Sequence, residues 1–392
     1  MIDVEAARAD TPGCALVAHL NNAGAALPPT PVVEAVVAHL RREAAIGGYE
    51  AAAEAADALE RPYPAAAALL GCRPDEVAVV ESATRAWQAA FLSVPLAPGD
   101  RVLTSAAEYG SNVVQLLHSA RGRGVSVDVV PDDAFGQVDV DALAAAVDER
   151  VKLVALTHVP TGNGLVNPAA EVGRVARVAG VTFLLDACQS LGQLPVDVGA
   201  IGCDLAVGTS RKFLRGPRGV GLLYARASTV DRLRPALVDL RSASWDAADR
   251  YHLRDDARRF EAWEISAAAK VGFGVALDYA RARGVDAIWA RVAALAADLR
   301  AALGDVPGVQ VHDRGAVRGA IVTFSVAGHE PAAVRDALHR SGINVWVTDA
   351  GQARFDLDRR GISALVRASV HYYNTAHEVD RCVAAVAALP RP

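Results

Sequence analysis

Seven short apolar runs recur along the first two thirds of the chain, and segments with a helical pattern separate them. Runs of this length that are rich in valine and leucine are typical of strands buried on both faces. They lie at 77–80, 101–105, 125–130, 152–156, 182–185, 205–207 and 220–224. Strands that alternate with helices form a mostly parallel sheet. The pattern therefore predicts an α/β lobe built on a seven-stranded sheet.

Helical patterns precede this region, and a different pattern follows it. Helix is predicted from Pro31 to about Leu40 and again from Glu50 to about Leu70, with a break at Gly47-Gly48. Residues 226–264 have clustered charges and few apolar runs, so we interpret them as a connection between two lobes. A smaller α+β lobe is expected after it, with long helices at 265–283 and 285–303 and short elements at 320–326, 334–341, 344–347 and 366–370.

The composition is that of a globular chain with two lobes. It has 392 residues, of which 52% are apolar and 22% charged. The net charge of -5 comes from interspersed signs, which argues against nucleic acid as a partner. Five scattered cysteines outside C-x-x-C spacing predict reduced thiols and no metal. Without a signal-peptide pattern or an apolar stretch of about 20 residues, we expect a cytoplasmic protein that does not bind membranes.

The segment from Gly208 to Gly221 places Lys212 between the end of an apolar strand and a turn punctuated by glycines. A lysine amine must lose its proton before it attacks an aldehyde, and partial burial beside Arg211 and Arg215 would lower its pKa. Lys212 is therefore a candidate for Schiff-base chemistry. The alternative is an ordinary surface lysine in a basic loop.

Three other polar positions follow predicted strands. Asp186 comes at the end of an apolar strand, where it either pairs with a protonated pyridine nitrogen or caps a helix. Thr84 opens a helix whose free N–H groups suit a phosphate, although a plain N-cap explains it nearly as well. Tyr109 is placed either to stack on a flat heterocycle or to pack in a core.

The order of these motifs resembles the class V, fold-type-I pyridoxal-phosphate enzymes, which include cysteine desulfurases, selenocysteine lyases and isopenicillin epimerases. The resemblance covers nearly the whole chain, and several ordered matches are more specific than any one of them. It rests on Leu20 to Gly24, Thr157-His158-Val159, Asp186 to Gln189, Ser210-Arg211-Lys212, Gly216 to Gly219, Arg367-Ala368-Ser369 and Tyr373-Asn374-Thr375.

This resemblance implies an architecture and a cofactor. The cofactor is pyridoxal 5'-phosphate, held in a large lobe at 26–260. The smaller lobe spans 261–392, and an N-terminal segment at 1–25 packs on it. Sites of this fold are usually completed by a second subunit, so the resemblance also implies a homodimer with shared active sites.

Carried over position by position, the resemblance assigns roles to residues around the cofactor. Lys212 is the Schiff-base lysine, Asp186 the partner of the pyridinium nitrogen, and Gln189 the partner of the ring's phenolic oxygen. Tyr109 takes the stacking place usually held by histidine. The phosphate falls to Ala83, Thr84, Thr209 and Arg211.

The resemblance also places substrate-binding residues. Arg367 falls where the family binds the α-carboxylate of the substrate, a planar bidentate task that suits a guanidinium. The alternative for this arginine is a salt bridge between the lobes. Tyr49 and Asn22 fall near the mouth of the substrate site.

The sequence departs from the family pattern in three places. Thr161 stands where many relatives have an asparagine near the cofactor, so either Thr161 or Asn163 serves there. Glu264 stands where relatives offer a threonine to the phosphate of the other subunit, and a carboxylate would repel it. Residues 344–360 contain no cysteine, although desulfurases place their catalytic cysteine there. Without that thiolate, desulfuration of free cysteine is not expected.

Segments 43–49 and 210–219 resemble the ergothioneine-pathway sulfoxide lyase and the lincosamide-pathway enzymes that process cysteine S-conjugates. Our leading hypothesis is a carbon-sulfur β-lyase of secondary metabolism, which releases a thiol, pyruvate and ammonia from an S-substituted cysteine. Alternatives are oxidative deamination driven by decarboxylation, transamination and epimerisation. An inactive scaffold is a further alternative, and the intact Lys212, Asp186 and Arg367 argue against it.

Overall fold

The large lobe of the computed structural model, which describes residues 2–390, is built on a seven-stranded sheet. All seven predicted strands are present, and the sheet is mostly parallel as expected. Strand β8 alone runs antiparallel to its neighbours β2 and β7. The sheet order is β2-β8-β7-β6-β5-β3-β4, with bounds β2 Val77–Val80, β3 Arg101–Ser105, β4 Ser126–Val130, β5 Val151–Thr157, β6 Thr182–Asp186, β7 Leu205–Thr209 and β8 Gly221–Ala225.

Alternate side chains of these strands enter two separate apolar cores, one on each face of the sheet. On β6, Phe183 and Leu185 belong to one core and Leu184 to the other. Helices α6 (Ala83–Ser93) and α7 (Gly110–Arg123) pack into the core of Leu184, whereas α9 (Ala169–Ala179) packs into the opposite core. Because both faces are covered, the open edge at the carboxyl ends of the parallel strands is the place for a site.

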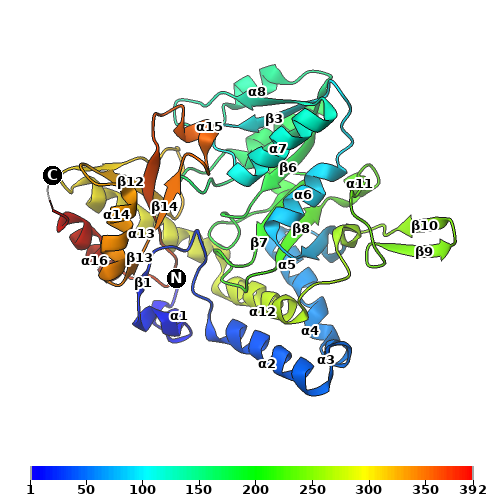
Figure 1. Ribbon diagram of the computed structural model, residues 1–392, viewed down its shortest axis with the longest axis horizontal. Helices are drawn as coiled ribbons and strands as arrows, with labels where there is room; N and C mark the ends of the chain where they lie inside the picture. Colours follow the sequence, from blue (N-terminus) through cyan, green and yellow to red (C-terminus); the bar gives the residue numbers. More distant parts are fainter. Residues whose placement is uncertain (1, 391–392) are drawn as a thin grey trace.

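The smaller lobe contains a four-stranded antiparallel sheet of order β11-β12-β15-β14. Its helices and strands are α13 Val285–Gly304, β11 Val309–Val311, β12 Ile321–Val326, α14 Pro331–Arg340, β14 Trp346–Asp349, α15 Arg354–Leu357, β15 Ala364–Ser369 and α16 Ala376–Ala387. In Figure 1 this lobe lies at the left, beside the large sheet.

The N-terminal segment lies against the smaller lobe. It includes α1 (Val4–Ala9), η1 (Pro12–Ala15) and β1 (Ala18–His19), and β1 pairs in parallel with β13 (Ile343–Asn344). Asn21 then forms a bridge with Ser369 on β15.

The N-terminal helices differ in detail from the prediction. Helix α2 (Thr30–Ile46) extends six residues beyond Leu40 and ends at Gly47, whose φ of 101° favours glycine. The region beyond it is divided into α3 (Gly48–Glu54), α4 (Ala56–Glu60) and α5 (Pro62–Leu70). The last break precedes Pro62, which has no N–H to continue a helix. Helix α12 (Ala267–Arg283) packs against α2 and α5 and so joins the lobes.

The segment at 226–264 is more ordered than the connection we expected. It contains α11 (Ala227–Val230), η3 (Ala257–Phe260) and a hairpin of β9 (Ala243–Ala247) and β10 (Arg250–Leu253) that projects from the molecule (Figure 1). In the hairpin, Trp245 lies opposite Tyr251. Most of its side chains are exposed, so it lacks the half-buried alternation by which a strand is recognised in a sequence.

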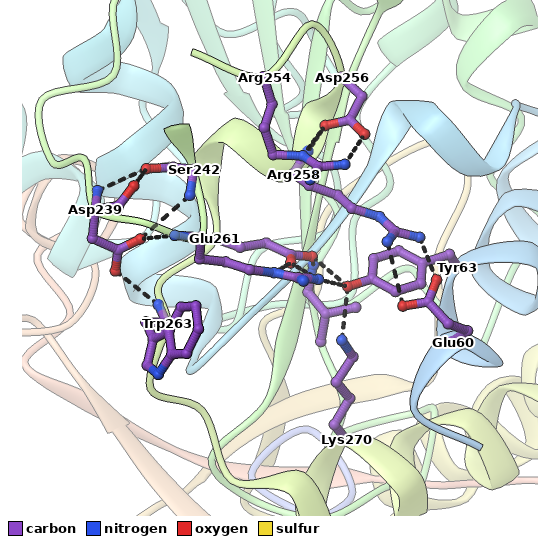
Figure 2. Close-up of polar contacts among 12 residues, drawn as sticks. Glu60, Tyr63, Asp239, Ser242, Arg254, Asp256, Arg258, Glu261, Trp263 and Lys270 are labelled. Carbon is purple, nitrogen blue, oxygen red and sulfur yellow. Dashed lines mark hydrogen bonds and ion pairs between the residues drawn. The ribbon is translucent and has the colours of Figure 1, made fainter. Parts of the chain in front are cut away.

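Figure 2 shows how this segment is anchored to the helices of the large lobe. The Tyr63 hydroxyl on α5 donates a hydrogen bond of 2.7 Å to Glu261 and accepts one of 2.7 Å from Lys270 on α12. Glu261 also accepts from the backbone N–H of Val79 on β2. Because these groups are buried, the network fixes the end of the segment, close to Glu264.

None of the helices within residues 2–390 has the length and the apolar character of a membrane span. The same residues contain no group of three or more His, Cys, Asp or Glu side chains placed to hold a metal ion.

Candidate functional site

A cavity lies at the carboxyl-terminal edge of the large sheet, where five strands end close together. Its walls come from the loops after β2, β3, β5, β6 and β7 and from the turn before β8. Most candidate residues from the sequence meet here. The lining residues include Ser82, Ala83, Thr84, Tyr109, Asn112, Thr157, Thr161, Asp186, Cys188, Gln189, Thr209, Arg211 and Lys212.

Lys212 lies on the floor of this cavity, in the loop after β7. Its amine is 5.9 Å from the centre of the Tyr109 ring. Burial lowers the pKa of Lys212 to about 8, and the Arg211 guanidinium acts in the same direction. The neutral fraction of this amine near neutral pH is therefore much larger than that of an ordinary lysine, and only the neutral form acts as a nucleophile or a base.

Asp186, at the end of β6, faces the same cavity and has both carboxylate oxygens engaged. Oδ1 accepts a hydrogen bond of 2.9 Å from the backbone N–H of Cys188. Oδ2 accepts one of 2.8 Å from the Asn112 side chain on α7. Each oxygen keeps a further lone pair for a donor inside the cavity.

Arg367 reaches the site from β15 of the smaller lobe. One guanidinium nitrogen donates to the Thr161 hydroxyl at 2.6 Å and the other to Asn21 Oδ1 at 3.2 Å, while Nε has no partner. Burial lowers the pKa of Arg367 to about 10. Within residues 2–390 it forms no salt bridge, so the alternative of an ion pair between lobes is wrong there. A buried cation without a counter-ion is a site for an anionic ligand.

The remaining cofactor candidates surround these groups. Gln189 donates to Thr161 Oγ1 at 3.0 Å and to the Ala23 carbonyl at 3.1 Å, and its buried Oε1 has no partner in the described chain. Ala83 and Thr84 form the first turn of α6, which the Ser82 side chain caps. Thr209 ends β7, and Arg211 donates to the Gly24 carbonyl.

Of the two alternatives near the cofactor, Thr161 lines the cavity. Asn163 instead hydrogen-bonds to Asp356 at 3.3 Å and to the Leu165 N–H at 2.9 Å. Asn163 thus has a local structural role.

Two predicted substrate residues, Tyr49 and Asn22, are not among the residues that line this cavity. Tyr49 is on α3 and is 80% exposed. Asn22 is fully buried, and its amide donates to the Ser369 carbonyl at 2.7 Å while accepting from Tyr373. Its neighbour Asn21 is the residue that contacts Arg367. The bridge between Asn21 and Ser369 places Asn21 beside Arg367, and this relation between distant segments is not visible in the sequence.

Two residues of the site were not predicted, namely Glu108 and Asn112. Glu108 is only 2% exposed and lies behind Tyr109, and Asn112 connects it to Asp186. A signal for them exists in the sequence. An acidic and an amide residue four positions apart begin a helix directly after a buried strand, and such spacing places both on one helix face.

The comparisons with known proteins agree with this geometry. Residues 18–382 match the family model of class V aminotransferases. The chain belongs to the class V aminotransferase family. A probable cysteine desulfurase of Methanothermobacter thermautotrophicus is 29% identical over 92% of both chains. A cysteine desulfurase of Cronobacter sakazakii is 30% identical over 96% of this chain and 94% of its own.

Solved structures confirm the fold. The apo cysteine desulfurase of Thermococcus onnurineus has a TM-score of 0.91 at 25% identity and covers 99% of this chain and 98% of its own. A cystine C-S lyase, C-DES, has a TM-score of 0.86 at 22% identity and covers 96% of this chain and 99% of its own. The protein therefore has the fold of type I pyridoxal-phosphate enzymes.

Pyridoxal phosphate is the cofactor of this class V enzyme, and the cavity fits it. The partly neutral amine of Lys212 suits an aldehyde, and the unpaired Oε1 of Gln189 points to a missing polar partner. The first turn of α6 offers backbone N–H groups to a phosphate. When bound, the cofactor withdraws electrons from the α-carbon of an amino acid.

The segment 344–360 contacts the chain beside this cavity. The Gln352 carbonyl accepts a hydrogen bond of 3.1 Å from the N–H of Gly110, next to Tyr109. Residues 344–360 contain no cysteine. Among the described lining residues, Cys188 is the one thiol, and burial raises its pKa well above the usual value, with Asp186 acting in the same direction. This thiol is therefore not an activated nucleophile.

Proposed function

We propose that this class V enzyme is a carbon-sulfur β-lyase that converts an S-substituted cysteine and water into a thiol, pyruvate and ammonia. The observation that carries the proposal is a cavity with Lys212 in its wall, where the buried Arg367 guanidinium binds Thr161 of the same wall. The nearby segment 344–360 contains no cysteine. The cysteine desulfurases among its relatives support cleavage of a carbon-sulfur bond. The absent loop thiol argues against storage of sulfur on the protein.

The residues divide the reaction between binding and proton transfer. The Arg367 guanidinium binds the α-carboxylate of the substrate, which holds the bond from the α-carbon to hydrogen over Lys212. The neutral Lys212 amine accepts that proton as a general base. The electron pair left at the α-carbon forms a double bond to the β-carbon and expels the thiolate. Addition of water then gives pyruvate and ammonia.

Product analysis tests this proposal. Purified holoenzyme is incubated with S-alkyl and S-aryl cysteines without a keto acid, and we expect thiol, pyruvate and ammonia in equal amounts. Carbon dioxide with an aldehyde would instead indicate oxidative deamination. A requirement for a keto acid would indicate transamination, and racemised substrate alone would indicate epimerisation. Persulfide from free cysteine would contradict the inference from the loop.

We also propose that two copies pair and share their sites. Large apolar side chains are exposed along the connection and its hairpin, including Leu237, Leu240, Trp245, Tyr251 and Trp263. Such a concentration of apolar surface is characteristic of an interface. Glu264 follows directly and is exposed, but its carboxylate would repel the phosphate of a second copy, so we propose that another group replaces that contact.

The pairing has a direct test. The native mass in solution should be twice the chain mass of 40.9 kDa. Replacing Trp245 and Tyr251 with serine should shift the population toward the monomer, whereas the same change at the exposed Val178 on α9 should not. A wild-type monomer at micromolar concentration would contradict the proposal.

Two further aspects of the function stay proposals. The five cysteines are free within the described chain, which is compatible with the reducing cytoplasm. A role in secondary metabolism, such as antibiotic biosynthesis, is supported by the resemblance of segments 43–49 and 210–219 to cysteine S-conjugate enzymes.

A further inference from the structure

Glu108 is a buried carboxylate that the mechanism above does not use. It lies between β3 and α7, behind the Tyr109 ring, and donors surround it. Its oxygens accept hydrogen bonds from the backbone N–H groups of Tyr109 at 2.9 Å and Thr157 at 3.1 Å. They also accept from the hydroxyls of Thr157 and Thr104. A carboxylate with this many donors is held in one orientation.

Asn112 transmits that orientation to the cavity. Its side-chain nitrogen donates to Glu108 Oε1 at 2.8 Å and to Asp186 Oδ2 at 2.8 Å. The two protons of one amide group therefore connect two acids. If the amide rotated by half a turn, its oxygen would face both acids, which the repulsion between oxygen atoms disfavours. Glu108 thus specifies which face of Asn112 meets Asp186.

Two hydrogen bonds then fix the orientation of the Asp186 carboxylate. The amide of Asn112 binds one of its oxygens, and the N–H of Cys188 binds the other. The plane of the carboxylate is then determined, and with it the direction of the lone pairs that face the cavity. A ring N–H requires a lone pair in one particular direction, so the strength of that contact depends on this plane.

We propose that Glu108 is a positioning residue, which acts through Asn112 to aim the Asp186 carboxylate at the ring nitrogen of the cofactor. The inference rests on the proposed role of Asp186. The contacts run from Glu108, in the loop between β3 and α7, through Asn112 on α7 to Asp186 on β6. Glu108 itself is not among the residues that line the cavity.

The protonation state of Glu108 affects its hydrogen bond from Asn112. Burial raises the pKa of Glu108 to about 7, the hydrogen bond from Thr157 lowers it, and the Asp186 charge raises it. As the pH falls through about 7, the carboxyl takes up a proton and accepts less well from Asn112. The contact to Asp186 should weaken over the same range. Lys212 and Cys188 also face Asp186, whose charge raises the pKa of each of them.

The test measures cofactor binding rather than turnover alone. Equilibrium dialysis compares pyridoxal phosphate with its 1-deaza analogue, in which carbon replaces the ring nitrogen. Both bear the same aldehyde and phosphate. Wild type should prefer pyridoxal phosphate, and in Glu108→Gln this preference should fall about 10-fold while affinity for the analogue stays within about 3-fold. Loss of affinity for both in equal measure would indicate a general structural role and overturn the proposal.

Further variants test whether Glu108 acts through Asn112. Asn112→Leu removes the connecting amide and should reduce the preference for pyridoxal phosphate over the analogue as Glu108→Gln does. The variant that combines both changes should lose no more of this preference than either change alone. Glu108→Asp should restore part of the preference. Thr104→Val removes a donor to Glu108 that does not contact Asn112, so its preference should stay at the wild-type value. An unchanged preference in Asn112→Leu would overturn the proposal even if Glu108→Gln failed to fold.

The outcome also separates this inference from the proposed site. If wild type showed no preference between the two coenzyme forms, the assignment of Asp186 would fail. If wild type showed the preference and Glu108→Gln kept it, only the role of Glu108 would fail.

Discussion

Lys212→Ala should eliminate turnover of S-substituted cysteines, with a loss of at least about 10³-fold. The variant removes both the amine that holds the cofactor and the proposed base. Borohydride reduction followed by peptide mapping should fix the cofactor to Lys212 in wild type. The chain makes this mapping simple, because Lys152 and Lys270 are its two other lysines.

Lys152→Ala and Lys270→Gln are the matched controls. Lys152 is exposed on β5, and Lys270 is buried outside the cavity against Tyr63. Both variants should retain cofactor capture. Coenzyme fixed to either of these lysines in wild type would contradict the proposed site.

Capture of the cofactor by the apo-protein should depend on pH in a specific way. Attack on the aldehyde requires the neutral amine, and burial lowers the pKa of Lys212 to about 8. The capture rate should therefore rise through pH 8 and level off above about pH 9, whereas an ordinary lysine would continue to gain until above its pKa of about 10.4. A stopped-flow absorbance series gives this profile, and a midpoint near pH 10 would contradict the buried position of the Lys212 amine.

Arg367→Ala should lower kcat/KM by about 10²- to 10³-fold, since it removes two charge-assisted hydrogen bonds to the substrate carboxylate. Arg367→Lys should lie between this variant and wild type, because an ammonium keeps the charge without the planar pair of donors. Asn21→Ala removes one neutral partner of the guanidinium and should have a smaller effect. Steady-state kinetics and a thermal melt for each variant distinguish lost binding from lost folding.

A second substrate shows whether the carboxylate is the group recognised. The S-substituted cysteamine with the same sulfur substituent lacks that carboxylate. Wild type should process it as poorly as Arg367→Ala processes the amino acid, and the variant should discriminate little between the two. A variant that still preferred the amino acid by 100-fold would show that another residue binds the carboxylate.

The sequence predicted elements whose pattern is local. All seven strands of the large sheet were found because their apolar runs are buried on both faces, and each lies within two residues of the predicted bounds. Lys212, Asp186 and Tyr109 were candidates because each directly follows such a strand. The hairpin at 243–253 was missed because its strands face solvent and carry no core pattern.

Other features depend on how distant segments meet. Spacing relates Glu108 to Asn112, but no spacing in the chain relates Glu108 to Thr157 on β5 or to Asp186 on β6. Asn21, to which no role was assigned, contacts Arg367, because its bridge to Ser369 determines which side chain faces that arginine. These relations follow from the tertiary structure, so the sequence alone did not predict them.

Arg367 is rooted in the smaller lobe, yet its guanidinium already contacts Thr161 in the large lobe and Asn21 in the N-terminal segment. A carboxylate that binds this cation therefore engages three distant stretches of chain at once. Binding of a carboxylate to Arg367 should therefore raise the free energy of unfolding of the whole molecule. Simple carboxylic acids that mimic the substrate should consequently protect both lobes together against heat and proteolysis.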